Sequence, residues 1–355
     1  MNNHFSKFIV KIILCGSILI FTAGFILYRE FLVEEVESKN PSAKLSAAQS
    51  NVQNEMKETK KNEDVQQYLI IPVSSDLEEA DILVTNQYMS KTIKLSIPGM
   101  NADYFKATPV RGQNTLLKNV YYEETKKGID LYLVLDQICE EKHYFNDSCI
   151  CMEFIPVTEL YENIVVLDPG HGGKDHGSVA YGVVEKEITM RVVRKVTQML
   201  QAEDVWVLNT RSTDEFVSYE NRIQAANEIQ ADLYLAFHTN ADGNTRITNG
   251  IHTYYADSPA KDGLTSQKFA TLLQNQMVMQ TKAFDKGTDK LNAKTEALNE
   301  LKMPAVMIET GYITNKQEAL RLTSDYYLNE LVQGVYDAVL QSYDAMGKDI
   351  RRGKK

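Results

Sequence analysis

Residues 165–173 read VVLDPGHGG, and this stretch decides how the C-terminal half of the chain is interpreted. The apolar residues predict the end of a buried strand, and Asp-Pro-Gly ends it. A histidine follows among glycines, which allow the backbone to turn sharply and to approach a ligand. In an open α/β sheet, ligands bind outside the carboxyl ends of the strands. The stretch therefore predicts a strand whose end carries a functional imidazole, His171.

The chain around this stretch alternates between strand and helix patterns. Strand-like runs are separated by segments with helical spacing of apolar residues, as in EITMRVVRKVTQMLQ; the runs are IVVLDPG, VWVLNT, DLYLAFH, GIHTYYA and PAVMIET. Such alternation predicts an α/β fold with a mostly parallel sheet covered by helices. We assign this α/β domain to residues 161–346 and a basic tail to residues 347–355.

The preceding residues differ in composition. Residues 67–158 contain short β-prone runs such as YLIIPV, TIKLSIPG and GIDLYLVLD, with turn residues between them, which predicts a small all-β domain. Residues 36–66 are polar and almost without large apolar side chains, so residues 31–66 are interpreted as a flexible linker. A length of 355 residues leaves room for two modest domains and these extra segments.

The N-terminal segment is strongly apolar. Residues 12–28 carry no charge, and Lys7 and Lys11 precede them. This predicts a membrane anchor within residues 1–30, in a single-pass cell-membrane protein whose C-terminal domains lie on the outer side. The alternative is a secreted protein after cleavage of a signal segment. A net charge of −10 argues against a nucleic-acid partner.

Three cysteines, Cys139, Cys149 and Cys151, fall in the β-rich region. Export to an oxidising compartment would allow a disulfide between Cys139 and one of the other two. Three reduced or buried thiols are an equally good interpretation. A zinc knuckle is not favoured, because His143 is the one histidine nearby and the spacing is irregular.

Four side chains are candidates for chemistry at the strand ends of the α/β domain. His171 and His238 each follow an apolar strand, and Glu309 follows the apolar run PAVMI. Glu185 begins the helix after the glycine-rich loop. Two imidazoles and one carboxylate form a known catalytic zinc set, and a further carboxylate can act as a general base. Each residue also has an ordinary interpretation; Glu185, for example, suits the positive end of a helix dipole.

Six motifs then suggest a family. They occur in order over roughly residues 163–345: LDPGHGGKDHG, VVEKEITMRV, TRSTDEFVSYENRIQAAN, ADLYLAFHTNAD, GIHTYY and MPAVMIETGYITN. Together they resemble the zinc-dependent N-acetylmuramoyl-L-alanine amidases of the bacterial cell wall (amidase type 3). The resemblance implies hydrolysis of the amide bond between N-acetylmuramic acid and L-alanine in peptidoglycan, with one zinc ion, during cell-wall remodelling, separation or lysis.

The resemblance also implies roles for individual residues. His171, Glu185 and His238 match the metal ligands, and Glu309 matches the catalytic glutamate. Glu187 is the nearest competitor of Glu185, and its position in the motif decides against it. Asp168 is interpreted as a group that shapes the loop or supports a metal ligand. Three residues remain either structural or substrate-contacting: Arg211, Arg222 and Asn240.

Two segments limit the resemblance. FDKGTDKLN stands where many relatives carry an Arg-Gly-Val-Lys-like stretch, so the substrate-side contacts depart from the family pattern. The β-rich region resembles, in strand pattern and position, a wall-targeting domain found ahead of some such amidases. Two alternatives to the amidase follow, a wall-binding module without activity and a zinc hydrolase of a different amide. The sequence does not identify an activator protein.

Overall fold

The computed structural model describes residues 68–146, 148–243, 246–291 and 296–351. The predicted anchor and linker lie outside these residues. Within them, no helix is both long and apolar enough to cross a membrane. As a correction to the prediction, the described residues give no support to a single-pass membrane localisation, and neither that localisation nor the membrane as a partner is carried forward.

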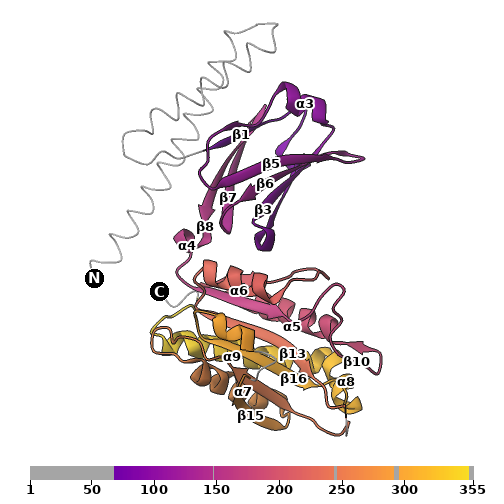
Figure 1. Cartoon of the computed structure of the whole chain (residues 1–355), viewed down its shortest axis with the longest axis vertical. Helices are drawn as coiled ribbons and strands as arrows, with labels where there is room; N and C mark the ends of the chain where they lie inside the picture. Colours follow the sequence, from indigo (N-terminus) through magenta and orange to yellow (C-terminus); the bar gives the residue numbers. More distant parts are fainter. Residues whose placement is uncertain (1–67, 147, 244–245, 292–295, 352–355) are drawn as a thin grey trace, which may run out of the picture. The chain divides into compact units, whose positions relative to one another are not determined.

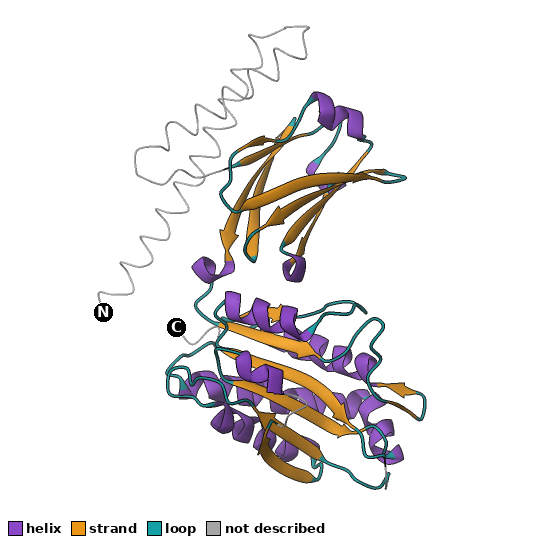
Figure 2. Cartoon of the chain, viewed as in Figure 1, coloured by secondary structure: helices purple, strands orange, loops and turns teal. Residues whose placement is uncertain are grey.

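The β-rich region consists of two antiparallel four-stranded sheets, ordered β4-β1-β8-β7 and β2-β3-β6-β5 (Figures 1 and 2). Alternating apolar residues of the two sheets, such as Ile71, Leu95 and Leu131, form one buried core. The strands are β1 (Leu69–Pro72), β2 (Leu83–Gln87), β3 (Thr92–Pro98), β4 (Arg111–Gly112), β5 (Leu117–Glu124), β6 (Gly128–Leu135), β7 (Cys139–Asn146) and β8 (Cys149–Pro156). Short helical turns lie between them, namely η1 (Glu79–Asp81), η2 (Tyr88–Ser90) and α3 (Ala102–Ala107), and α4 (Val157–Leu160) follows β8.

The three described cysteines are free and buried. Cys149 and Cys151 lie two residues apart on β8, while Cys139 is paired with Pro156 at the other end of that strand. The sequence left open a disulfide from Cys139 or three buried thiols. The structure shows three thiols and no disulfide among the described residues.

The α/β region has a six-stranded sheet, ordered β12-β9-β13-β16-β14-β15. Its strands are β9 (Ile164–Pro169), β12 (Trp206–Asn209), β13 (Leu233–Asn240), β14 (Ile251–Tyr255), β15 (Asp285–Lys290) and β16 (Ala305–Tyr312); a separate hairpin pairs β10 (Val179–Ala180) with β11 (Val183–Val184). The helices are α5 (Glu185–Leu200), α6 (Tyr219–Glu228), α7 (Ser266–Thr281), η3 (Glu296–Glu300), α8 (Lys316–Thr323) and α9 (Asp325–Ala345).

The sheet is mixed, which corrects the prediction of a mostly parallel sheet. β14 runs antiparallel to β16, and β15 runs parallel to β14, so these two strands oppose the other four. A parallel connection needs a crossover of a dozen or more residues, usually with a helix. β13 ends at Asn240 and β14 begins at Ile251, which is too short a connection for such a crossover, so β14 runs in the opposite direction.

Helices cover both faces of this sheet (Figure 2). One core contains Val165, Leu235 and Ile308 with apolar residues of α5, α7, α8 and α9. The other contains Tyr234, Ala236 and Met307 with residues of α6 and η3. Because side chains alternate along a strand, His238 and Glu309 project from the same face as this second core, which we call the α6 face. This face carries the candidate site at its carboxyl end.

Candidate metal centre

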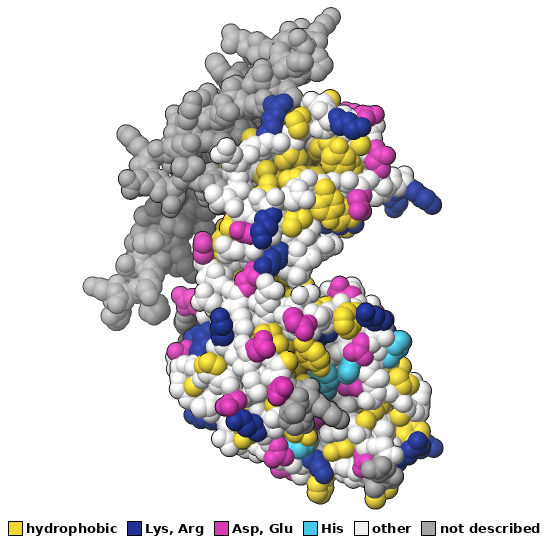
Figure 3. Space-filling model, viewed as in Figure 1, with side chains coloured by type: hydrophobic (Ala, Val, Ile, Leu, Met, Phe, Trp, Pro, Cys, Tyr) yellow, Lys and Arg dark blue, Asp and Glu magenta, His cyan; other side chains and the backbone are white. Residues whose placement is uncertain are grey.

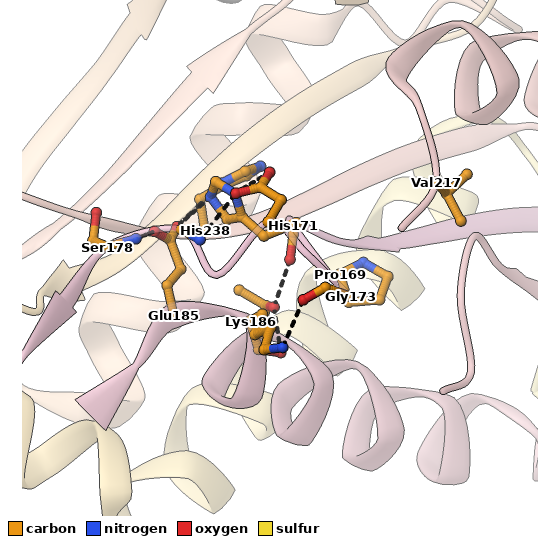
Figure 4. A network of polar contacts seen from close by, with 12 residues as sticks. Pro169, His171, Gly173, Ser178, Glu185, Lys186, Val217 and His238 are labelled. Carbon is orange, nitrogen blue, oxygen red and sulfur yellow. Dashed lines mark hydrogen bonds and ion pairs between the residues drawn. The ribbon is translucent and has the colours of Figure 1, made fainter. Parts of the chain in front are cut away.

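Three side chains from separate elements converge at the carboxyl end of the central strands. His171 lies in the loop after β9, Glu185 is the first residue of α5, and His238 lies near the end of β13 (Figure 4). One potential ligand atom of each lies within 4.8 Å of the others. Glu185 Oε1 is 3.2 Å from both His171 Nε2 and His238 Nδ1. The arrangement can hold one cation between two imidazoles and a carboxylate.

The backbone of the DPGHGG loop is unusual at the histidine itself. His171 has a φ of 62°, and Gly172 and Gly173 follow with φ of 132° and 57°. A left-handed conformation is unfavourable for a residue with a Cβ, so the surrounding contacts must stabilise it. Arg222 supplies two of them, because its guanidinium donates to the carbonyls of His171 and Pro169 at 2.9 and 3.0 Å.

Two glycines leave the space that the imidazoles occupy. A Cβ on Gly170 would lie 2.3 Å from His238 Cε1 and 2.5 Å from its Nε2. A Cβ on Gly177 would lie 2.6 Å from both Glu185 Oε2 and His171 Cδ2. These distances are far below an ordinary contact of about 3.5 Å. Position 170 therefore requires glycine because a Cβ has no space there. The backbone conformation does not require it, because the φ of Gly170 is not in the left-handed region.

Buried charges fix the loop beneath the site. Asp168 is 1% exposed; it forms an ion pair with Arg222 and accepts hydrogen bonds from Thr210 Oγ1 and, at 2.5 Å, from the Tyr234 hydroxyl. Arg211 donates to the carbonyls of Pro169, Gly170 and Lys186. Both arginines thus donate hydrogen bonds to backbone carbonyls of this chain. These contacts favour a structural role for Arg211 and Arg222 over a substrate-contacting one.

Asn240 also has a local contact. Its side-chain oxygen accepts a hydrogen bond from the backbone N–H of Ala241 at 2.8 Å, where β13 ends. Asn240 is partly exposed, and its backbone carbonyl accepts from Ile313. These contacts position the strand end beside the candidate ligands.

Glu309 lies next to His238 across the sheet, because the two residues are partners in the parallel register of β13 and β16. Glu309 as a whole is partly exposed, but its Oε2 atom is buried and has no hydrogen-bond partner among the described residues. Leaving a carboxylate oxygen buried and unpaired is unfavourable. Such an atom, on the strand neighbour of His238, is expected where a ligand completes the site.

Comparisons with known proteins match the α/β region of the chain. The sequence profile of the N-acetylmuramoyl-L-alanine amidase family, Amidase_3, matches residues 165–341. The uncharacterised protein YqiI of Bacillus subtilis is 31% identical over 180 residues, which cover 51% of this chain and 84% of YqiI.

The chain belongs to the N-acetylmuramoyl-L-alanine amidase family.

Other relatives match the same half of the chain. The N-acetylmuramoyl-L-alanine amidase LytC of Bacillus subtilis is 32% identical over 182 residues, which cover 50% of this chain but only 35% of LytC. An amidase of known structure from Clostridium difficile 630 is 31% identical, with 51% of this chain and 97% of that chain covered and a TM-score of 0.48. The bond named by the family is the amide between N-acetylmuramic acid and L-alanine, and relatives in Staphylococcus aureus are named as probable cell wall amidases.

The candidate cluster of His171, Glu185 and His238 stabilises positive charge. Burial disfavours the ionised form of Glu185, but hydrogen bonds from His171 and His238 outweigh it and hold the pKa of its carboxyl well below the usual range. Burial likewise opposes protonation of His171, yet Glu185 and Asp175 raise its pKa to about 9. Two backbone N–H groups, of Ser178 and Thr239, also donate to Glu185 at 2.7 and 2.8 Å. A bound cation would likewise be stabilised by the negative charge of Glu185.

The sequence interpretation missed Asp175. Its Oδ2 is 2.8 Å from His171 Nδ1, so the other ring nitrogen, Nε2, faces Glu185. A carboxylate on the outer nitrogen of a metal-binding histidine fixes its tautomer and ring orientation. The signal was available, because Asp175 follows His171 by four residues in a turn-rich loop. Glu187, the competitor of Glu185, is exposed and does not belong to the cluster.

Proposed function

We propose that this chain is a zinc-dependent N-acetylmuramoyl-L-alanine amidase acting on peptidoglycan. The observation that carries the proposal is the convergence of His171, Glu185 and His238 beside the unpartnered Oε2 of Glu309. Membership of the amidase family supports the substrate. The proposal includes a catalytic domain over residues 161–346 and a separate β-rich domain over residues 67–158.

The donor set fits zinc. Two imidazole nitrogens and one carboxylate oxygen are a set that catalytic zinc uses, with a position left open for water or substrate. His171, Glu185 and His238 would hold one ion. A zinc ion bound there would make water acidic enough to attack near neutral pH and would polarise the amide carbonyl.

Glu309 would carry out the proton transfers. Burial raises the pKa of its carboxyl to about 7, with Glu185 adding to the effect and His238 opposing it. A general base works best when its pKa lies near the working pH. Glu309 would accept a proton from the attacking water and deliver it to the nitrogen of L-alanine, so that the amine leaves in a neutral form. Asp175 would keep His171 oriented throughout.

Purified wall and metal analysis test this proposal directly. The protein is freed of metal with a chelator, reloaded with zinc or left without it, and incubated with purified peptidoglycan; zinc content and product masses are then measured. We expect about one zinc per chain and free stem peptides that begin with L-alanine, from the zinc-loaded sample alone. Intact amide bonds after incubation with zinc-loaded, folded protein would refute the amidase activity.

Asp175→Asn is expected to weaken zinc binding by roughly 10- to 100-fold, which is typical when the outer-shell partner of a histidine ligand is changed. The amide can present a donor to Nδ1 and thereby favour the wrong tautomer of His171. Competition with a coloured chelator measures the affinity. His176→Gln, a change at the neighbouring exposed histidine, is the matched control and should bind zinc like the wild type. Equal zinc affinity in both variants would remove Asp175 from the site.

A further inference from the structure

Two cysteines of the β-rich region lie side by side on β8. Cys149 and Cys151 are two residues apart, so their side chains project from the same face of the strand. Ile150 and Met152, which alternate with them, belong to the core between the two sheets. The cysteines therefore lie on the outer face of their sheet, where they are 9% and 8% exposed. This pair of thiols has no role in the proposed amidase reaction.

The two thiols contact each other. The Cys151 thiol donates a hydrogen bond to Cys149 Sγ, which lowers the pKa of the Cys149 thiol and raises the pKa of the Cys151 thiol. Cys149 Sγ also lies 3.2 Å from Asn146 Oδ1, and the backbone N–H of Cys149 donates to the same oxygen at 3.0 Å. Asn146 is the register partner of Cys149 on β7. The hairpin of β7 and β8 thus holds two sulfur atoms in a fixed pair.

The spacing along the strand disfavours a disulfide within this pair. Alternate residues of an antiparallel strand have Cα atoms about 6.8 Å apart, at the upper end of the range for disulfides. Their Cβ atoms point the same way and so stay farther apart than the roughly 3.5–4.5 Å that the bridge needs. Closing it would bend β8 at Ile150, which is 1% exposed in the core. An ion placed between the two sulfur atoms requires no such bend.

The number of ligands selects the kind of ion. Among the described residues, the group of three or more histidine, cysteine or carboxylate ligands is that of His171, Glu185 and His238. His143, the nearest histidine in the sequence, is paired with Met152 and so projects from the opposite face of the sheet. The cysteine pair therefore lacks the four ligands of a structural zinc site. Monovalent copper, Cu(I), is soft, prefers thiolate sulfur and accepts two such ligands.

We propose that Cys149 and Cys151 bind one Cu(I) ion between their sulfur atoms. The inference goes beyond the proposed amidase function and does not depend on it, because the pair lies on β8 and the candidate zinc ligands lie in the α/β region. Both thiols lose their protons when the ion binds, so the affinity for Cu(I) rises with pH. The histidine side chains on the face seen in Figure 3 belong to the α/β region, so nitrogen neighbours of a bound copper ion would indicate a different site.

The test titrates the full chain, loaded with one equivalent of zinc, with Cu(I) against a coloured Cu(I) chelator, without oxygen and with ascorbate as the reductant. Every protein carries Cys15→Ser, so that the thiols compared are the three described ones. We expect one Cu(I) per chain. Cys149→Ala and Cys151→Ala should each lower the affinity by more than about 100-fold, which exceeds the usual effect of a change outside the ligand shell. Cys139→Ala, which removes a buried thiol of the core, is the matched control and should keep the affinity.

X-ray absorption at the copper edge identifies the ligands of the bound ion. Two sulfur neighbours support the site, whereas nitrogen neighbours would place the ion at histidines and overturn it. An affinity that is unchanged in Cys149→Ala or in Cys151→Ala, or that does not change with pH, would overturn it as well. Circular dichroism shows whether each variant is folded. Where an alanine variant does not fold, the serine variant of the same cysteine keeps the size of the side chain and must show the same loss of affinity.

Discussion

Replacing Glu309 with glutamine is expected to lower kcat on peptidoglycan by roughly 100- to 10,000-fold, the usual contribution of a positioned general base. Glutamine fills the same space but cannot accept a proton. Zinc binding should persist, because the ligand set of His171, Glu185 and His238 remains complete. The rate is measured as release of stem peptide from purified wall. Glu187→Gln removes an exposed carboxylate near the same loop and serves as the control that keeps its activity.

The same change is expected to stabilise the metal-free protein. Burial raises the pKa of Glu309 from 4.5 to about 7, so folding disfavours its ionised form. The penalty is absent below pH 4.5, grows between pH 4.5 and 7, and is complete above pH 7. Each pKa unit corresponds to about 1.4 kcal/mol, and the residual accessibility of Glu309 reduces the total to roughly 2 kcal/mol.

Urea unfolding of the metal-free wild type and Glu309→Gln at pH 5 and pH 8 checks this sign. The variant should gain stability at pH 8 and little at pH 5. An equal gain at both pH values would contradict the ionisation argument and point to a packing effect. A gain at pH 8 combined with lost activity would show that the site retains its carboxylate at the expense of stability.

Gly170→Ala is expected to weaken zinc binding by at least roughly 100-fold, since a displacement of about 1 Å in a catalytic group has effects of this size. The added Cβ would lie 2.3–2.7 Å from three ring atoms of His238. The imidazole must therefore move by about 1 Å to reach an ordinary contact distance. Zinc–nitrogen bonds are confined to about 2.0–2.1 Å, so the moved ring can no longer share one ion with His171 and Glu185.

The zinc affinity of Gly170→Ala is measured by competition with a chelator, with circular dichroism to show that the protein is folded. Gly243→Ala is the matched control, because a Cβ there meets nothing within 4 Å and its φ is not in the left-handed region. It should bind zinc like the wild type. Unchanged zinc affinity in folded Gly170→Ala would show that His238 is not a ligand in the arrangement described here.

Much of the fold was predictable because its strands and helices show apolar periodicity and turn residues in the local sequence. Apolar residues at helical spacing predicted α5, and each of Ile188, Val192 and Leu200 is buried as expected. The strand and loop of VVLDPGHGG were predicted from their composition alone. β15 was missed, because DKGTDK has no apolar alternation; it joins the sheet edge through backbone pairing with β14.

The candidate ligands could also be named from the sequence, because imidazoles and carboxylates after apolar strands are rare and costly without a partner. Asp175 was missed because its role depends on the direction of a ring nitrogen of His171. Arg211 and Arg222 could not be assigned, since a buried guanidinium and a substrate-binding one look the same in sequence.

From the sequence it was possible to predict most of the strands and helices of the α/β region, the loop that carries His171, and the residue types of a candidate metal site. The tertiary structure decided the direction of β14, the space beside His238 that Gly170 leaves, and the register that places His238 beside Glu309. The physical reason is that periodicity and turn chemistry act between near neighbours in the chain. Strand register and the packing of one side chain against a distant backbone join residues many positions apart, and these relations exist only once the sheet has formed.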